Sequence, residues 1–222
     1  MADYLLYTHK NSYAMTTHLM LEKLGVDYDT RWFNVHQAET FPPEFKELNP
    51  NARVPVLVTP DGPVYESAAT LMVLSERHAN QFMPATNEPD RARALQWLFY
   101  LMSTFQPEVL IQFNAERYFP NDESMQSKLR SASLRELEIL WKIIEDAFET
   151  GPWFLGEGYS ICDMLFLMQA IWKENQPADL GQYPNSVRMM ETAFARPAVQ
   201  RVMAIHQIER LVEIQPSTRT TG

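Results

Sequence analysis

Hydrophobic positions in the first 80 residues fall into short strand-like runs separated by segments with helical spacing. Residues 4–8 form an aromatic and aliphatic run, which is typical of a buried strand. After a polar turn, apolar residues over 15–24 share one helical face, and Gly25 follows where a left-handed C-terminal cap is expected. The chain therefore opens with a strand, a turn and a helix.

The remainder of this region predicts three more strands and two helices. Prolines after Phe41 permit only a short helix, because proline starts a helix but cannot continue one. Ser67 is expected to cap a helix that runs to about His78. The strands are expected over residues 29–35, 54–58 and 64–66. The resulting order, βαβαββα, predicts an α+β domain with a mixed sheet and a hairpin at its end, which is the thioredoxin-like order.

The pattern changes after residue 80. Residues 81–89 contain two prolines and lack periodicity, which indicates a linker. Beyond it, helical periodicity predicts an all-α region with long helices over residues 90–119, 124–150, 160–175 and 185–214. We therefore expect a thioredoxin-like domain at residues 1–80, a linker at 81–89 and an all-helical domain at 90–222.

Composition and charge narrow the classes of partner. With 222 residues, of which 45% are hydrophobic, the chain has enough apolar surface for packed cores. The net charge of -9 provides no positive field for phosphate backbones or anionic lipid, so neither nucleic acid nor a membrane surface is expected as a partner. A single cysteine, Cys162, excludes an intrachain disulfide, and a cytoplasmic location is expected. Five histidines without ligand spacing predict no metal site.

Three motifs occur in a specific order along the chain. Residues 49–57 read NPNARVPVL, Glu66 and Ser67 begin eleven residues past Pro55, and the Ser160-Ile-Cys-Asp163 run follows FLGEG. In this order the motifs resemble the soluble (cytosolic) glutathione transferase superfamily, bacterial type, with some nu-class-like features. The resemblance covers nearly the whole chain. It implies the glutathione transferase fold, a thioredoxin-like domain followed by an all-α helical bundle.

The resemblance implies a site for glutathione, an extended anionic tripeptide. The peptide bond before Pro55 is expected to be cis, with the backbone of Val54 pairing with the tripeptide. Ser67 would bind the γ-glutamyl carboxylate at a helix start and Glu66 the ammonium group. Arg53 is a candidate for the glycyl carboxylate. The alternatives are a helix cap for Ser67 and a solvated surface position for Arg53.

A transferase must favour the thiolate of glutathione, usually with a hydroxyl or amide donor near sulfur. The turn after the first strand contains three candidate donors, Asn11, Ser12 and Tyr13, and no cysteine. Ser12 is the first candidate, and its alternative role is a helix N-cap. Ser160 and Asp163 match a capping box, which indicates a folding role for Asp163 rather than a catalytic one.

These observations predict a glutathione transferase that passes the thiolate to a hydrophobic electrophile. The second domain would supply an apolar pocket from the aromatic residues of its first helix, among them Trp97, Phe99, Tyr100, Phe105, Phe113, Tyr118 and Phe119. Glutathione is the expected co-substrate, and the resemblance implies a homodimer. Two alternatives stay open: a nu-type glutathione-dependent disulfide reductase or peroxidase, and a catalytically silent binding or regulatory protein.

Overall fold

The computed structural model describes residues 2–35, 37, 41–79, 82–172, 177 and 179–208. These residues group into two compact units. The first unit runs to Arg91 and also contains the segment that begins at Phe194, and the second unit contains Ala92–Ala193. The segment from Phe194 includes a helix that follows almost the entire second unit in sequence.

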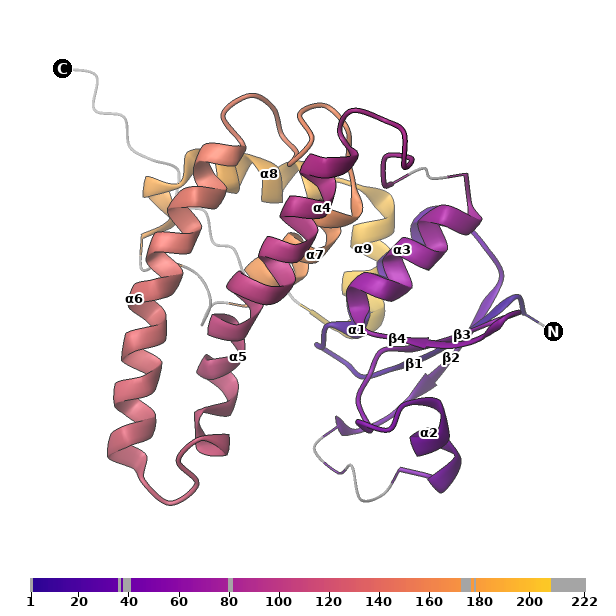
Figure 1. Ribbon diagram of the computed structural model, residues 1–222, viewed down its shortest axis with the longest axis horizontal. Coiled ribbons are helices and arrows are strands. Elements are labelled where there is room, and N and C mark those ends of the chain that lie inside the picture. The colour runs from indigo at the N-terminus through magenta and orange to yellow at the C-terminus, as the bar shows by residue number, and fades with distance from the viewer. Residues whose placement is uncertain are drawn as a thin grey trace. The chain divides into compact units, whose positions relative to one another are not determined.

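The first unit is a four-stranded sheet with helices on both faces. Its elements are β1 (Tyr4–Thr8), α1 (Ala14–Leu24), β2 (Tyr28–Trp32), α2 (Pro43–Leu48), β3 (Val56–Thr59), β4 (Gly62–Tyr65), α3 (Ser67–Arg77) and α9 (Pro197–His206). The strand order is β2-β1-β3-β4, with β1 parallel to β2 and both other pairs antiparallel. Helices α1 and α3 lie on one face of the sheet and α2 lies on the other (Figure 1). The predicted order βαβαββα and the mixed sheet are confirmed.

Alternation of side chains along the strands divides the core of this unit between the two faces of the sheet. Tyr7 and Val56 are buried with Phe41 and Phe45 in the cluster beside α2. Leu6, the neighbour of Tyr7, is fully buried and must point to the opposite face, where α1 and α3 lie. The sheet is thus covered on both faces.

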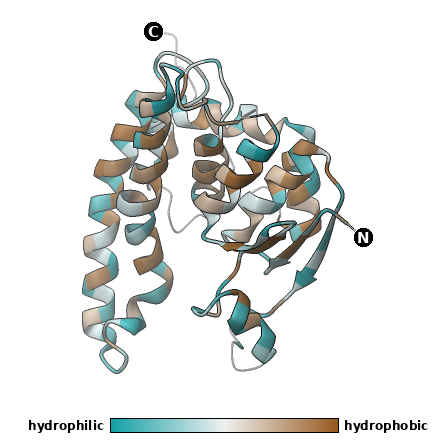
Figure 2. Cartoon of the chain, turned by 45° about the vertical axis from the view of Figure 1, so that its right-hand side comes forward, coloured by the Kyte–Doolittle hydropathy of each residue, from teal (hydrophilic) through white to brown (hydrophobic). Residues whose placement is uncertain are grey.

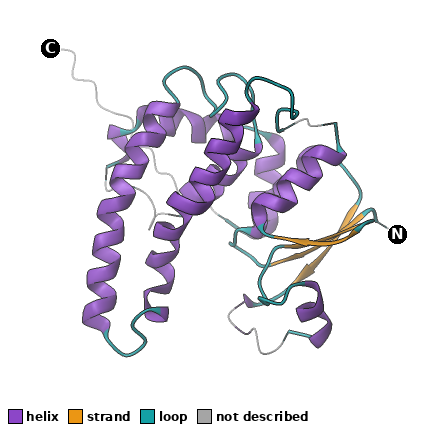
Figure 3. Ribbon diagram, in the orientation of Figure 1, coloured by secondary structure: helices purple, strands orange, loops and turns teal. Residues whose placement is uncertain are grey.

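The second unit is helical in its described part. Its elements are α4 (Arg91–Phe99), the π-helix η2 (Tyr100–Phe105), α5 (Gln106–Asn114), the short 3₁₀-helix η3 (Ala115–Arg117), α6 (Glu123–Ala147), α7 (Ile161–Ala170), the 3₁₀-helix η5 (Leu180–Gln182) and α8 (Pro184–Phe194). Figure 3 shows these helices joined by loops. Helix α6 carries hydrophilic and hydrophobic residues along its whole length (Figure 2). Among the described helices, none has both the length and the apolar character that a membrane span requires.

Two predicted helices are interrupted. The segment predicted as one helix over 90–119 contains the π-helix η2, where Gln169 donates to the carbonyl of Leu101 at 3.2 Å and Ser103 donates to that of Phe99 at 2.6 Å. The segment predicted over 185–214 breaks at Pro197, because proline cannot continue a helix. Residues 209–214 of that prediction lie outside the described part of the chain.

The predicted capping box at the start of α7 is confirmed. Oδ2 of Asp163 accepts hydrogen bonds from the backbone N–H and the hydroxyl of Ser160, both at 2.7 Å, and Oδ1 accepts one from the N–H of Phe154 at 2.9 Å. Burial raises the pKa of Asp163 to about 7, while these donors oppose the shift. The side chain therefore joins the loop around Phe154 to a helix whose residues are all buried.

Replacing Asp163 with Ala should lower the free energy of unfolding by about 3 kcal/mol, because buried N–H groups of Ser160 and Phe154 would lose their acceptor. Asp146→Ala is the matched control, since Asp146 is an exposed acid near the end of α6. Urea denaturation of both variants and the wild type measures the difference. Equal stability of the two variants would contradict a structural role for Asp163.

Candidate functional site

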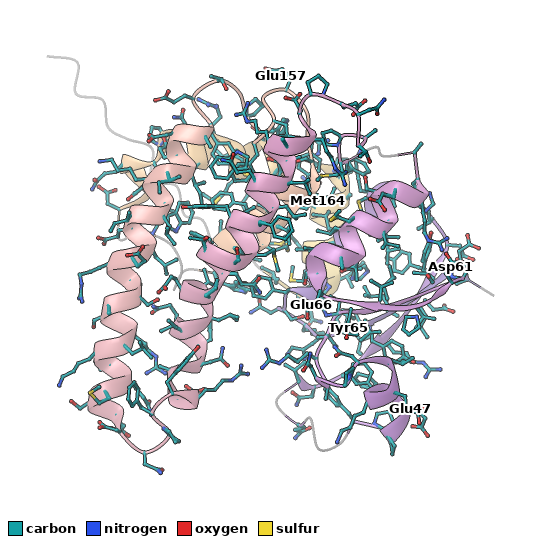
Figure 4. All side chains as sticks on the ribbon, in the orientation of Figure 1. Glu47, Asp61, Tyr65, Glu66, Glu157 and Met164 are labelled. Carbon is teal, nitrogen blue, oxygen red and sulfur yellow. The ribbon has the colours of Figure 1, made fainter. Side chains whose placement is uncertain are left out.

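Three segments meet at one end of the sheet of the first unit. Val56 in β3 is paired with Tyr7 in β1 and with Tyr65 in β4. The turn after β1, the residues before β3 and the residues after β4 therefore lie at the same end of these strands. Figure 4 shows Tyr65 and Glu66 at this end of the hairpin and Asp61 at the other. All predicted glutathione-binding and thiol-activating residues belong to these segments.

The segment before β3 has the predicted cis bond between Val54 and Pro55. Asn49, a buried side chain, holds the loop that leads to it: its Nδ2 donates to the carbonyl of Arg53 at 2.8 Å and its Oδ1 accepts from the N–H of Asn51 at 3.0 Å. Sequence reasoning missed this role of Asn49, although the residue begins the motif that carried the resemblance. The buried side chain of Asn49 thus orders the loop through its hydrogen bonds to the backbone.

The segment after β4 presents the start of α3. The prediction that Ser67 caps this helix is wrong: Glu66 occupies the N-cap position, and Ser67 is the first helical residue. No side chain caps the helix. Within the described part of the chain, the Ser67 hydroxyl makes no hydrogen bond, and its carbonyl accepts from the Thr70 hydroxyl at 2.8 Å. The first turn of α3 therefore keeps backbone N–H donors and the positive end of the helix dipole available to an anion.

The turn after β1 carries the three candidate thiol donors. Ser12 Oγ donates to the carbonyl of His9 at 2.8 Å and accepts from the N–H of Ala14 at 3.3 Å. Asn11 is exposed and has a left-handed backbone, with φ 52°. Tyr13 is half-buried at the N-cap position of α1. The structure thus gives Ser12 the capping-type role that the sequence analysis held as its alternative, and it places Asn11 at the surface of the turn.

Unfavourable backbone conformations concentrate around these segments. Five described residues other than glycine have a positive φ, and Asn11, Ala52 and Glu66 are three of them. An L-residue in the left-handed region costs roughly 1–2 kcal/mol, and such residues cluster at functional sites. Each of the three segments at the end of the sheet contains or borders one of these residues.

Two other predicted features have different surroundings. The Arg53 side chain is exposed, and no ion pair to it is found among the residues described.

Cys162 lies in the second unit, fully buried, and its thiol donates to the carbonyl of Ala94 at 3.4 Å. Burial raises the pKa of Cys162 far above its ordinary value, so this thiol is neither accessible nor ionised. The described residues contain no group of three potential metal ligands.

The aromatic residues predicted to line a second pocket differ in burial, and Tyr100 and Phe119 are half-buried. Trp97 and Phe105 are buried in the core of the second unit, where Trp97 packs against Phe154 with ring centroids 4.7 Å apart. The exposed group consists of Phe99, Phe113 and Tyr118, with 63%, 43% and 62% of their surface accessible. The exposed group leaves apolar surface available on the second unit.

Comparisons with known proteins show which proteins the chain is similar to. Residues 12–77 match the model of the glutathione S-transferase N-terminal domain. Disulfide-bond oxidoreductase YfcG of Escherichia coli (strain K12) is 27% identical over 199 residues, which cover 86% of this chain and 89% of that protein. A glutathione transferase homologue from Sulfitobacter, solved with bound glutathione, has a TM-score of 0.81 and 21% identity over 92% of this chain and 99% of its own.

A glutathione transferase from Burkholderia graminis, solved with two glutathione molecules bound per subunit, has a TM-score of 0.78 and 25% identity over 91% of this chain and 88% of its own. The match to the N-terminal domain covers the cis-proline loop, the start of α3 and the turn after β1 from Ser12 onwards. Residues 12–77 thus belong to the glutathione S-transferase N-terminal domain family, and the fold and these similarities over most of the chain support membership of the soluble glutathione transferase superfamily.

Proposed function

We propose that the protein is a glutathione transferase, which binds glutathione at this end of the sheet and passes the thiolate to a hydrophobic electrophile. One observation carries the proposal: the pairing of Val56 with both Tyr7 and Tyr65 brings the cis-proline loop, the start of α3 and the turn after β1 together. Bound glutathione in similar structures supports it. The thioredoxin-like domain, residues 1–80, would hold the tripeptide.

The chemistry of glutathione matches the groups at this end of the sheet. Val54, next to the cis bond, would pair its backbone with the tripeptide as an added strand does. Ser67 and the N–H groups at the start of α3 would bind the γ-glutamyl carboxylate, because a helix N-terminus favours an anion. The Glu66 carboxylate would pair with the ammonium group. Arg53 would attract the glycyl carboxylate from the exposed edge.

Asn11 is the donor that we place ahead of Ser12. The single hydroxyl proton of Ser12 is used on the carbonyl of His9, so Ser12 would have to break that bond to reach sulfur. Asn11 has two amide N–H donors on an exposed side chain, and Tyr13 is the third candidate. A hydrogen-bond donor near sulfur favours the thiolate over the thiol, so it lowers the pKa of the glutathione thiol towards neutral pH.

The second unit would provide the surface for the co-substrate. Exposed aromatic side chains of the second unit, such as Phe99 and Tyr118, suit an apolar electrophile. Proximity to a stabilised thiolate would provide most of the rate. We further propose that the protein works as a cytoplasmic homodimer in detoxification, without a metal.

Disulfide reduction is the second candidate function. It is favoured by the similarity to a disulfide-bond oxidoreductase and by the similar structure with two glutathione molecules per subunit. Two glutathione molecules would reduce one small disulfide, giving glutathione disulfide and two thiols, so no protein cysteine would take part. Faster turnover of a small disulfide than of an aryl halide would select this function. Turnover of neither by a folded, glutathione-binding protein would indicate a silent binding role.

Replacing Ser67 with Ala should weaken glutathione binding by about tenfold to a hundredfold, because a hydrogen bond to a charged group contributes about 1.5–3 kcal/mol. Titration calorimetry at neutral pH measures the dissociation constant. Ser131→Ala is the matched control, since this exposed serine of α6 bonds only a carbonyl of its own helix. The proposed site is wrong if the wild type does not bind glutathione at millimolar concentration or if Ser67→Ala binds as the wild type does.

Replacing Asn11 with Gly should raise the pKa of the bound glutathione thiol by about one unit, a tenfold loss of thiolate preference. Glycine accepts the left-handed backbone at this position, so the change removes the amide without adding strain. The ultraviolet absorbance of the thiolate across a pH titration gives the thiol pKa. Ser12→Ala and Tyr13→Phe should leave it nearly unchanged; a shift confined to Ser12→Ala would make Ser12 the donor.

Replacing Cys162 with Ala should leave glutathione-dependent turnover of both an aryl halide and a small disulfide within about twofold of the wild type. The reason is that the thiol is buried and its pKa is raised, so it cannot attack a disulfide. Steady-state rates with each substrate, at equal amounts of folded protein, provide the measurement. A selective loss of disulfide turnover would show that a protein thiol takes part after all.

A further inference from the structure

Helix α9 is anchored to α1 at two points, although almost the whole second unit separates the two helices in sequence. In the middle of α9, Arg201 Nε donates to Oε2 of Glu22 at 2.6 Å and Nη2 donates to the carbonyl of Glu22 at 3.3 Å. At the end of α9, Nε2 of His206 lies 2.9 Å from Nδ1 of His18. Figure 1 shows α9 beside α1. Helix α9 is part of the first unit.

The hydrogen bonds between these helices run in one direction. The Tyr28 hydroxyl donates its only proton to Glu22 through a short bond. Oη of Tyr28 must then accept from Nε2–H of His18, 2.8 Å away. Nδ1 of this neutral His18 carries no proton, so it accepts from Nε2–H of His206. The order of donors is therefore His206 to His18 to Tyr28 to Glu22, and it requires a neutral His18, because Nδ1 of His18 must accept.

Burial opposes protonation of both histidines. Nδ1 of His206 is buried and has no hydrogen-bond partner among the described residues. The His206 ring packs against the Trp32 ring, with their centroids 5.0 Å apart. Burial lowers the pKa of His206 to about 3, and His18, Lys10 and His9 act in the same direction. Burial also lowers the pKa of His18, opposed by the charge of Glu22.

The carboxylate at the end of the chain of donors is held ionised. Burial opposes ionisation of Glu22, but hydrogen bonds from Arg201 and Tyr28, together with the charges of Arg201 and His18, lower its pKa overall. An ionised Glu22 accepts the hydrogen bond from the Tyr28 hydroxyl. This bond sets the direction of each hydrogen bond from Tyr28 back to His206. His206 is the donor at the other end of this series.

The same end of α9 also reaches the turn after β1. Gln207, the left-handed C-cap of α9, accepts a hydrogen bond from Lys10 Nζ at 2.5 Å. Lys10 directly precedes the candidate thiol donors at residues 11–13, and α1, which carries His18, directly follows them. The end of α9 therefore contacts the chain on both sides of this turn.

We propose that His206 is a positioning residue, which acts through His18 and α1 to hold the turn at residues 11–13 in place for the glutathione thiol. The role rests on the proposed function, in which the turn supplies the donor to sulfur. His206 touches neither glutathione nor the donor. A displacement of the turn by a fraction of an ångström would weaken the donor–sulfur bond, which depends steeply on geometry.

Two variants separate the hydrogen bond of His206 from its packing. His206→Phe keeps a ring against Trp32 but removes the donor to His18. His206→Gln keeps an N–H donor near the position of Nε2 and cannot take up a proton. Backbone hydrogen exchange of residues 9–17, measured without glutathione at neutral pH, should be at least threefold faster in His206→Phe and close to the wild-type rate in His206→Gln.

With glutathione bound, the thiol pKa should rise by about one unit in His206→Phe, and His206→Gln should restore it. A role in stability alone would lower the melting temperature of His206→Phe without a change in exchange at residues 9–13 or in thiol pKa, and this result would overturn the inference. Identical behaviour of the two variants would also overturn it. If the wild type fails to bind glutathione, the proposed function fails, whereas the exchange data still decide whether His206 holds the turn.

The pH dependence of stability gives a third readout. Both histidines have a folded pKa below the unfolded value of about 6.5, so the unfolded chain binds more protons as the pH falls. The stability that the neutral pair provides is thus complete above about pH 6.5 and decreases below it. The melting temperature of the wild type should fall more steeply between pH 7 and pH 5 than that of His206→Gln. Equal slopes would show that His206 does not titrate on unfolding.

Discussion

The antiparallel pairing of β3 with both β1 and β4 is the constraint on which the candidate site depends. Val56 lies between Tyr7 and Tyr65, so the cis-proline loop and Glu66 emerge side by side. A slip of one residue would turn Val56 to the opposite face of the sheet and separate these segments. Such a slip is costly because it would remove the fully buried Val56 side chain from the core cluster that it forms with Tyr7 and Phe45.

Short polar side chains hold each segment at the end of the sheet. Asn49 bonds the loop before the cis proline, Ser12 bonds the turn after β1, and Thr70 bonds the carbonyl of Ser67 in α3. These hydrogen bonds satisfy backbone groups that would otherwise need water. Other backbone groups of the same segments can still bind a ligand. The site is thus preorganised by residues that need not contact glutathione, which is why strained residues such as Glu66 persist there.

Local patterns made the order of elements and the capping box of Asp163 predictable from the sequence, whereas the cis bond at Pro55 was predictable only through the resemblance to the glutathione transferase superfamily. The π-helix at residues 100–105 was not predictable, because one extra residue per turn hardly changes hydrophobic periodicity. The break at Pro197 had a visible signal in the proline itself, yet periodicity on both sides favoured one helix. The bond between His18 and His206 has no local signal, since 188 residues separate the partners.

The turn after β1 contains no cysteine, so in both proposed reactions, transfer and disulfide reduction, glutathione itself would supply the reactive sulfur. The first unit would form the same thiolate for both reactions, so the choice between them depends on what binds next to sulfur. A second glutathione needs cationic or N–H partners for its carboxylates, whereas an apolar electrophile needs aromatic surface. Phe99, Phe113 and Tyr118 give the second unit exposed aromatic surface, which is the kind of surface that the proposed transfer would need.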